Sequence, residues 1–538
     1  MTEEFTNALE RYRPYLSLEE FNALEAEANQ PAASAVRLNL SKLDTSPLHR
    51  STTEGKKGGE TGSDRLKFLS QKFGWVTQPL PFSENSLQIL DFKTAPSQTR
   101  EYLLGQYYLQ DAASILPVSL FSATKKPQLK LDMAASPGGK TTQMIDASLD
   151  RDFLIANDSA ASRLPALRTV LQTWGAANYA ITNYPGERFG DWFPETFNQI
   201  LLDAPCSMQS LRASASHPHR PITEDERSRL ANRQIALLFS AAKALKVGGE
   251  LVYSTCTLNP EEDEAVVSAL LEAFPGAFHL DPAPAQKYQV RGFTEFEGQQ
   301  YHPDLIHALR IWTFTFKTNG FFAAKLIKDA PISHDPGSPP TRDFRVTGYK
   351  HLSPELHQEL INMLSDTYGI EFKTLLNDLG LIPMRKEDAI HLFPAAYLES
   401  FKTLPFTAIG LPLGRYIRDR FETGVEFILR FGGFFTRQIW EMPEEFAQQW
   451  MRGHSATLAA AHHALHVDLG RRLGERKVAG AKAGLRIAAE EGAHEGSEGA
   501  LELGEGDPLV DEQALDLVEH GRMRGVVVDP VGAAGHDD

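Results

Sequence analysis

Short apolar runs alternate with longer stretches of helical periodicity between residues 105 and 328. The apolar runs have the length of buried strands, and the stretches between them repeat apolar residues at helical spacing. The expected strands span residues 129–135, 153–159, 178–183, 198–207, 250–257 and 319–328, and the expected helices span 138–149, 161–175 and 225–246. Strands separated by helices of this length form a mostly parallel sheet with helices on both faces. The pattern therefore predicts an α/β fold with a doubly wound sheet.

The segments on either side of this sheet follow other patterns, so we expect five parts in the chain. Residues 1–104 combine a helical pattern with extended segments, which predicts a small α+β domain. A stretch at 51–64 contains four glycines and no apolar residue, and it is typical of a flexible insert. The sheet domain at 105–328 is followed by a linker at 329–342 that is rich in proline and glycine. A second α+β unit then spans 343–455, and a tail spans 456–538.

The tail differs from the rest of the chain in composition and charge. No Phe, Tyr or Trp occurs in the 88 residues after Trp450, and such a segment buries little core. We therefore expect the tail to be largely disordered. From Ala488 to Asp538 the net charge is −12, so the total of −16 leaves only −4 for the first 487 residues. The acidity of the whole chain thus does not exclude a nucleic-acid partner.

The remaining composition excludes several classes of protein. With 42% hydrophobic and 23% charged residues, the chain is typical of a soluble globular protein. No apolar run has the roughly 18 residues of a membrane span, and the N-terminus does not resemble a signal peptide, so we expect a cytoplasmic protein without a membrane partner. Cys206 and Cys256 are the only cysteines. Two cysteines do not make a disulfide framework, and without paired histidines they do not complete a zinc site.

A glycine-rich turn, LDMAASPGGKT at 131–141, joins the first expected strand to a helix. Its glycines allow close approach of a ligand, and the helix N-terminus offers free N–H groups to a carboxylate. The turn matches neither the dinucleotide pattern nor the P-loop, so a ligand without phosphates, such as S-adenosylmethionine, fits better. Asp158 ends the next strand and can accept the ribose hydroxyls. The alternative is an ordinary turn in which Asp158 caps the following helix.

Cys206 and Cys256 each lie at the carboxyl end of an expected strand, and one helix separates the two strands. Reacting groups gather at this edge of open α/β sheets. Buried free cysteines are also common as small hydrophobic residues, which is the alternative. A thiolate that adds to carbon 6 of cytosine makes carbon 5 able to attack a sulfonium methyl group. Asp203, three residues before Cys206, is placed to hydrogen-bond the base, or else it caps the next turn.

These motifs together resemble the Nop/Sun family of RNA cytosine-5 methyltransferases, of the bacterial ribosomal-RNA type. They occur in the family's order over residues 35–328. The matching pieces are RLNLSK, QDAAS, LDMAASPGGKTTQ, ANDSAASRL, LLDAPCS, RQIALL, ALKVGGELVYSTCTLNPEEDEAV and GFFAAKLIK. The resemblance implies a Rossmann-like methyltransferase domain, S-adenosylmethionine as cofactor and RNA as partner. The N-terminal domain is then expected to bind RNA.

The resemblance also implies roles for single residues. Cys256 is expected to be the nucleophile, Cys206 to assist product release, and Asp203 to contact both cofactor and base. The expected cofactor-binding residues are Ala134, Ala135, Ser136, Pro137, Gly138, Gly139, Lys140, Asp158, Arg163 and Asp203, and no metal ligand is expected. DNA cytosine-5 methyltransferases use similar chemistry, but their nucleophile lies in a Pro-Cys strand with an ENV motif that this chain lacks.

The chain departs from the family pattern at two positions. Pro185 stands where the family has an Asp that faces the adenine, so Asn183 or the Pro185 backbone has to substitute. Met208 stands where the family has a glycine after DAPCS. The unit at 343–455 resembles the PUA-like RNA-binding domain of the bacterial ribosomal members, which favours small-subunit ribosomal RNA. We expect the protein to be a monomer. A transfer-RNA methyltransferase and a noncatalytic ribosome-assembly factor remain as alternatives.

Overall fold

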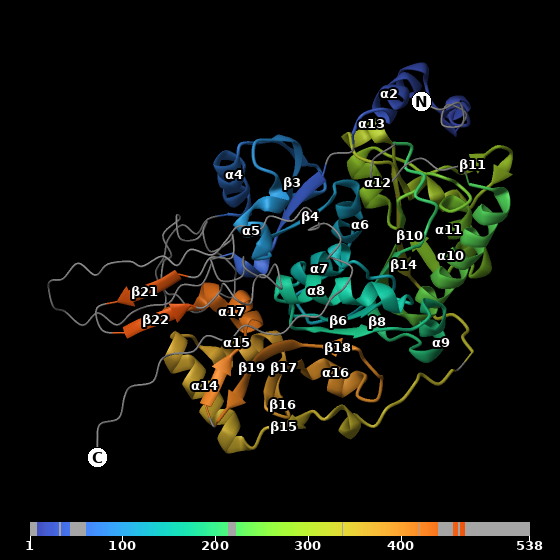
Figure 1. The fold of residues 1–538 in the computed structure, drawn as a ribbon. Helices are drawn as coiled ribbons and strands as arrows, with labels where there is room; N and C mark the ends of the chain where they lie inside the picture. Colours follow the sequence, from blue (N-terminus) through green and yellow to red (C-terminus); the bar gives the residue numbers. More distant parts are fainter. Residues whose placement is uncertain are drawn as a thin grey trace, which may run out of the picture.

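A mixed sheet of nine strands forms the centre of the computed structural model (Figure 1). The structure describes residues 8–31, 34–43, 61–212, 222–335, 337–418 and 420–438, and the backbone of 456–460 and 463–467. The parallel strands of the central sheet are β5 (Leu129–Asp132), β6 (Phe153–Asn157), β7 (Tyr179–Thr182), β8 (Phe197–Asp203) and β9 (Leu245–Thr255). The antiparallel strands are β10 (Phe278–Leu280), β13 (Leu309–Ile311), β14 (Phe321–Lys328) and β18 (Ala408–Ile409). The predicted α/β fold class is thereby confirmed.

The strand order determines where a ligand site can form. The order is β10-β14-β9-β8-β5-β6-β7-β18, with β13 pairing β14. The chain runs from β5 outward to β6 and β7, and then returns to the other side of β5 with β8 and β9. This reversal makes the carboxyl ends of β5 and β8 the topological switch point, where open α/β sheets bind their ligands. The glycine turn follows β5, and the two cysteines follow β8 and β9.

Helices cover both faces of the sheet because alternate strand residues are apolar on each side. Leu154 and Ala156 of β6 pack with residues of α7 (Gly139–Asp146) and α8 (Leu164–Trp174). Phe153 and Ile155 point the other way, into the core that includes α10 (Glu224–Ala244) and α11 (Glu264–Ala273). The shorter helices of this domain are α6 (Leu116–Ser119), α9 (Phe189–Trp192), α12 (Pro282–Tyr288) and α13 (Thr313–Phe316), and a small hairpin joins β11 (Glu295–Phe296) to β12 (Gln299–Gln300).

The N-terminal part divides into a helix and a small sheet. Helix α2 (Leu18–Ala28) belongs to the same core as α10 and α11. The antiparallel sheet contains β1 (Ser34–Leu38), β2 (Trp75–Leu80), β3 (Ser83–Phe92) and β4 (Tyr107–Asp111), with helices α4 (Gly62–Phe73) and α5 (Arg100–Leu103).

The expected flexible insert at 51–64 lies mainly outside the described residues. The prediction is wrong for residues 62–64, because they form the first turn of helix α4, which begins at Gly62. Thr61 accepts a hydrogen bond from the Asp64 backbone, and the Asp64 side chain accepts one from the Thr61 backbone. This capping box starts the helix inside a stretch whose composition resembles a linker.

The C-terminal unit contains an antiparallel sheet of five strands, with β15 (Lys350–His351), β16 (Leu381–Lys386), β17 (Ala389–Pro394), β19 (Leu411–Ile417) and β20 (Arg420–Thr423). Its helices are α14 (Pro354–Tyr368), α15 (Phe372–Leu379), α16 (Ala395–Ser400) and α17 (Val425–Phe431). Strand β18 leaves this unit and pairs with β7, so the unit extends the central sheet. Figure 1 shows the unit beside that edge of the sheet.

Two short strands, β21 (Ala456–Ala460) and β22 (His463–Val467), pair at the start of the predicted tail, a hairpin that its composition did not indicate. Residues 468–538 of that tail lie outside the described residues. In the part of the chain that the structure describes, no helix combines the length and the apolar character that crossing a membrane requires.

Candidate active site

The glycine turn between β5 and α7 is closely packed and open at its helix end. Gly138 has φ +115°, and a Cβ there would lie 2.9 Å from Val170 Cγ1. A Cβ on Gly139 would lie 2.9 Å from Tyr108 Cε1. No side chain caps the N-terminus of α7. The first backbone N–H groups of α7 are therefore not capped by a side chain, and such groups are suited to bind a carboxylate.

Asp158 directly follows β6, and its side chain hydrogen-bonds the backbone of the glycine turn. Its carboxylate accepts hydrogen bonds from Ser136 N at 3.2 Å and from Ala160 N at 2.9 Å, and Arg163 forms an ion pair with it at 3.4 Å. The Arg163 guanidinium also donates to the Ser136 carbonyl. Among the expected cofactor residues, the structure therefore brings Asp158 and Arg163 to the turn at 134–140. The local capping role of Asp158 is present as well, through Ala160.

Pro185, the departure expected near the adenine, and Asn183, its candidate substitute, lie after β7. Asn183 donates its side-chain amide to the Asp158 carbonyl at 2.7 Å, and the Pro185 carbonyl accepts from Arg188 N at 3.2 Å. Pro185 is exposed. Asn183 is thereby fixed next to the residue expected to bind the ribose.

Asp132, at the end of β5, is a buried acid that the sequence analysis missed. Its Oδ2 accepts from the Thr141 hydroxyl at 2.7 Å, whereas its Oδ1 is buried without a hydrogen-bond partner. Burial raises the pKa of Asp132 to about 7, although the hydrogen bond from Thr141 works against this shift. The signal in the sequence was a charged residue at the end of an otherwise apolar strand, directly before the glycine turn.

Cys206 and Cys256 meet at the carboxyl ends of neighbouring parallel strands. Their sulfur atoms lie 3.1 Å apart. The hydrogen bond with Cys256 and burial raise the pKa of the Cys206 thiol well above its usual value, and the charges of Cys256 and Glu262 raise it further. Cys206 therefore keeps its proton, and its sulfur lies at hydrogen-bond distance from that of Cys256.

Asp203 links the cysteines to the glycine turn. Its carboxylate accepts from Lys140 Nζ at 2.7 Å and from Ser254 Oγ at 2.8 Å. Burial alone would lower the pKa of Lys140, but Asp203 and the Cys256 sulfur raise it above its usual value. Lys140 therefore stays charged, at the first turn of α7 and within reach of the cysteine site. Side chains from the start of α7, from the ends of β8 and β9 and from the loops that follow these two strands thus form a single cluster.

This combination defines a class of protein. A doubly wound sheet, an uncapped glycine turn after β5 and an acid after β6 are the features of an S-adenosylmethionine-dependent methyltransferase. The residues fit that cofactor, because the free N-terminus of α7 suits a carboxylate and the unpartnered oxygen of Asp132 suits an ammonium group.

The comparisons with known proteins give the family. The model of the family described as 16S rRNA methyltransferase RsmB/F matches residues 120–327. The chain is 32% identical over 400 residues to the ribosomal RNA small subunit methyltransferase F of Erwinia tasmaniensis, covering 72% of this chain and 79% of that protein. It is 30% identical to the protein of the same name from Aeromonas salmonicida, covering 82% and 85%. The chain belongs to the RsmB/F family, so the resemblance to Nop/Sun methyltransferases is confirmed.

A solved structure supports the fold. The methyltransferase homolog protein from Pyrococcus horikoshii is 27% identical, with a TM-score of 0.50, and the match covers 61% of this chain and 100% of that one. The protein is therefore an enzyme with a methyltransferase fold and S-adenosylmethionine as its methyl donor.

Proposed function

We propose that this enzyme methylates carbon 5 of a cytosine in small-subunit ribosomal RNA, with Cys256 as the nucleophile. The single observation that carries the proposal is the pair of thiols 3.1 Å apart beside the Asp203–Lys140 ion pair. To be methylated at carbon 5, a cytosine needs a nucleophile that adds to carbon 6 and polar groups that polarise its ring. A noncatalytic RNA-binding protein needs none of these groups.

In this proposal the cofactor is bound by the turn from Ala134 to Lys140 and by the acidic side chains of Asp132 and Asp158 next to that turn. The free N–H groups of α7 receive its carboxylate, and Asp132 receives its ammonium group. Asp158, oriented by Arg163, accepts the ribose hydroxyls, and Asn183 takes over contacts near the adenine. Bound S-adenosylmethionine supplies a methyl group carried on a sulfonium.

The chain's own residues perform the remaining chemistry. The Cys256 thiolate adds to carbon 6, which forms a carbon–sulfur bond and shifts the ring electrons toward carbon 5. Asp203 hydrogen-bonds the polar edge of the base, and Lys140 stabilises the negative charge that develops on the ring. After methyl transfer, the proton on carbon 5 passes to solvent water. The electrons of that bond restore the ring double bond, and the carbon–sulfur bond breaks with its electrons returning to Cys256. Cys206 donates its S–H to the leaving sulfur.

The choice of RNA rests on the relatives. Proteins named ribosomal RNA small subunit methyltransferase F align with 72% and 82% of this chain, which is more than the catalytic domain alone. We therefore assign RNA contacts to the N-terminal unit at 1–104 and to the PUA-like unit at 343–455, with 329–342 as their linker to the catalytic domain at 105–328. A ribosomal substrate implies action in the cytoplasm. A monomer suffices, since one chain supplies all the loops of the site.

Removal of the nucleophile tests this function. Small-subunit RNA is incubated with S-adenosylmethionine and either the wild-type protein or Cys256→Ala, and the nucleosides are analysed by mass spectrometry. We expect 5-methylcytidine from the wild type and a loss of at least about 10³-fold in the variant, because a covalent step has no substitute. Thr124→Ser, at an exposed position outside the site, serves as the control and keeps its activity. Wild-type rates from Cys256→Ala would refute the assignment.

A further inference from the structure

The loop that carries Cys206 and the loop that carries Cys256 converge on one buried carboxylate, that of Glu262. Glu262 has no exposed surface. It accepts hydrogen bonds from Ser207 N at 2.9 Å, from the Ser207 hydroxyl, from Asn259 Nδ2 at 3.1 Å and from Gln234 Nε2 at 3.1 Å. These donors come from three different parts of the chain.

The donors are the immediate supports of the two cysteines. Ser207 follows Cys206, and Asn259 lies three residues after Cys256. Gln234, on α10, also donates to the Pro205 carbonyl at 2.9 Å, directly before Cys206. Asn259 and Thr257 both hydrogen-bond the Ser207 hydroxyl, at 3.1 Å each. Glu262 therefore joins both loops to α10 at one point.

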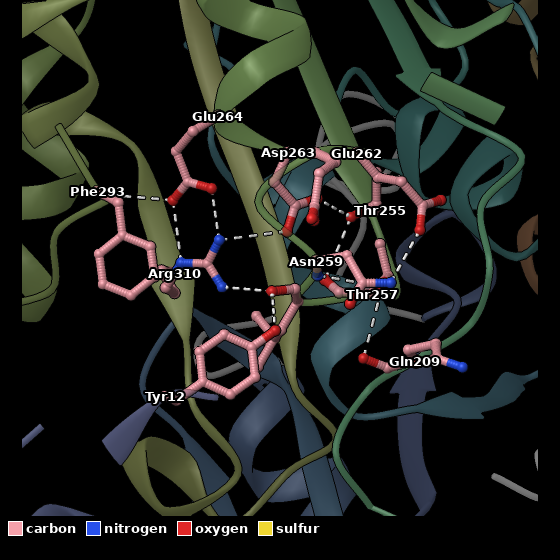
Figure 2. Close-up of polar contacts among 12 residues, drawn as sticks. Tyr12, Gln209, Thr255, Thr257, Asn259, Glu262, Asp263, Glu264, Phe293 and Arg310 are labelled. Carbon is pink, nitrogen blue, oxygen red and sulfur yellow. Dashed lines mark hydrogen bonds and ion pairs between the residues drawn. The ribbon is translucent and has the colours of Figure 1, made fainter. Parts of the chain in front are cut away.

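Glu262 differs from the two acids that follow it. Asp263 and Glu264 both form ion pairs with the buried Arg310, which also donates to the Leu258 carbonyl at 2.8 Å. Figure 2 shows Glu262 directed away from Arg310, on the side of Asn259. Within the described part of the chain, no lysine or arginine forms an ion pair with Glu262. Because a buried carboxylate without a cation depends on its hydrogen bonds, the loss of any one of these donors is costly.

We infer that Glu262 is a positioning residue that holds Cys206 at hydrogen-bond distance from Cys256 and thereby permits release of the methylated base. This inference rests on the proposed function, in which Cys206 assists the departure of Cys256. The charge of Glu262 is also one of the causes that raise the pKa of Cys206, after the hydrogen bond with Cys256, burial and the charge of Cys256. The same carboxylate thus fixes the place of Cys206 and favours its protonated form.

The variant Glu262→Gln tests this inference because its amide has nearly the same shape. Its nitrogen faces donors, so at least one of the hydrogen bonds is lost. We expect methylation to fall on the order of 10²-fold, since small displacements of reacting groups have effects of this size. The covalent RNA adduct should accumulate as a slow band on a denaturing gel, as in Cys206→Ala. The dissociation constant for S-adenosylmethionine should stay within about twofold, because the glycine turn is untouched.

The matched control is Glu261→Gln, at the preceding residue. The half-buried Glu261 pairs with Arg11 and Arg227 and hydrogen-bonds neither cysteine nor Ser207, so this variant should methylate RNA and form the disulfide as the wild type does. Glu262→Asp keeps the charge but is too short for all donors, and it should show the same defect as Glu262→Gln. It replaces Glu262→Gln if that protein does not fold.

A second measurement separates failure of this inference from failure of the proposed function. A mild thiol oxidant such as diamide joins the neighbouring thiols into a disulfide and takes up the two hydrogens, which mass spectrometry detects without any RNA. We expect Glu262→Gln to form the Cys206–Cys256 disulfide about tenfold more slowly than wild type. If oxidation is equally fast and no adduct accumulates, the inference is wrong. If Cys206→Ala also gives no adduct although oxidation slows in Glu262→Gln, the release role of Cys206 fails and the positioning role stands.

Discussion

At the scale of single residues, the two cysteines have different surroundings although the sequence presents them alike. Cys206 lies in the loop held by Glu262, and its pKa is raised well above the usual value, whereas Cys256 directly follows β9. The sequence could predict that both lie at strand ends, because apolar runs directly precede them. It could not predict the raised pKa of Cys206, to which the hydrogen bond with Cys256, burial and the charge of Glu262, 56 residues further along the chain, contribute.

Asp132 gives a prediction about pH. Burial raises the pKa of this carboxyl to about 7. If the carboxylate receives the ammonium group of S-adenosylmethionine, affinity should rise by up to about tenfold per pH unit below pH 7 and level off above it. Isothermal titration calorimetry between pH 5.5 and 8.5 checks this, and Asp132→Asn should bind more weakly at all pH values without that rise. If the affinity of Asp132→Asn for S-adenosylmethionine rose with pH in the same way, a group other than Asp132 would be responsible for the pH dependence.

The raised pKa has a second consequence, for stability. The folded protein binds this proton more tightly than the unfolded chain, so the contribution of Asp132 to stability falls as pH rises from about 4 to about 7. Thermal melting of Asp132→Asn and wild type should therefore diverge across this range, in favour of the variant at higher pH.

At the scale of elements, the site is built from strand ends and the turns that follow them. The alternation of strands and helices was predictable, and so was the glycine turn, since both are local patterns. Two features of the fold could not be predicted from the sequence. The start of α4 lies in a glycine-rich stretch and depends on the short capping box of Thr61 and Asp64. Strand β18 has only two residues and pairs with β7 across more than 200 positions, so no local period indicates it.

A substitution at Gly138 tests whether the glycine turn binds the cofactor. Gly138→Ala introduces a Cβ at φ +115° within 2.9 Å of Val170, so we expect a loss of about 1–3 kcal/mol of stability and at least about tenfold weaker binding of S-adenosylmethionine. Gly248→Ala is the control, because its φ is +77° but no atom lies within 4 Å of the added Cβ. It should lose stability only, without weaker binding. Equal cofactor affinity in both variants, measured by calorimetry, would contradict the role of this turn.

At the scale of the whole molecule, buried charges join the N-terminal sheet, the catalytic domain and the C-terminal unit. Arg37 of β1 pairs with Asp146 of α7 at 3.0 Å and also donates to the Gly139 carbonyl in the cofactor turn. Arg430 of α17 lies 3.6 Å from Asp150 and donates to the Ser41 carbonyl at 3.0 Å. The units predicted from composition are therefore parts of one packed body in the region of α7, which sequence periodicity does not reveal.

The Arg430–Asp150 pair tests this junction. Arg430→Met leaves a buried carboxylate without its cation, so we expect a loss of about 3–5 kcal/mol in the free energy of unfolding. Asp150→Asn in the same protein should recover a large part of that loss, because the uncompensated charge is gone. Denaturant unfolding of the two single variants and the double variant measures the coupling. Additive losses would mean that the two residues do not act together.

The central claim is that Cys256 forms the bond to cytosine, and RNA containing 5-fluorocytidine tests it most directly. Fluorine on carbon 5 cannot leave as a proton, so the covalent complex persists after methyl transfer and can be digested and sequenced by tandem mass spectrometry. We predict that the methylated nucleotide is attached to the peptide that contains Cys256. Attachment to Cys206, or methylated RNA with both cysteines unmodified, would contradict the account.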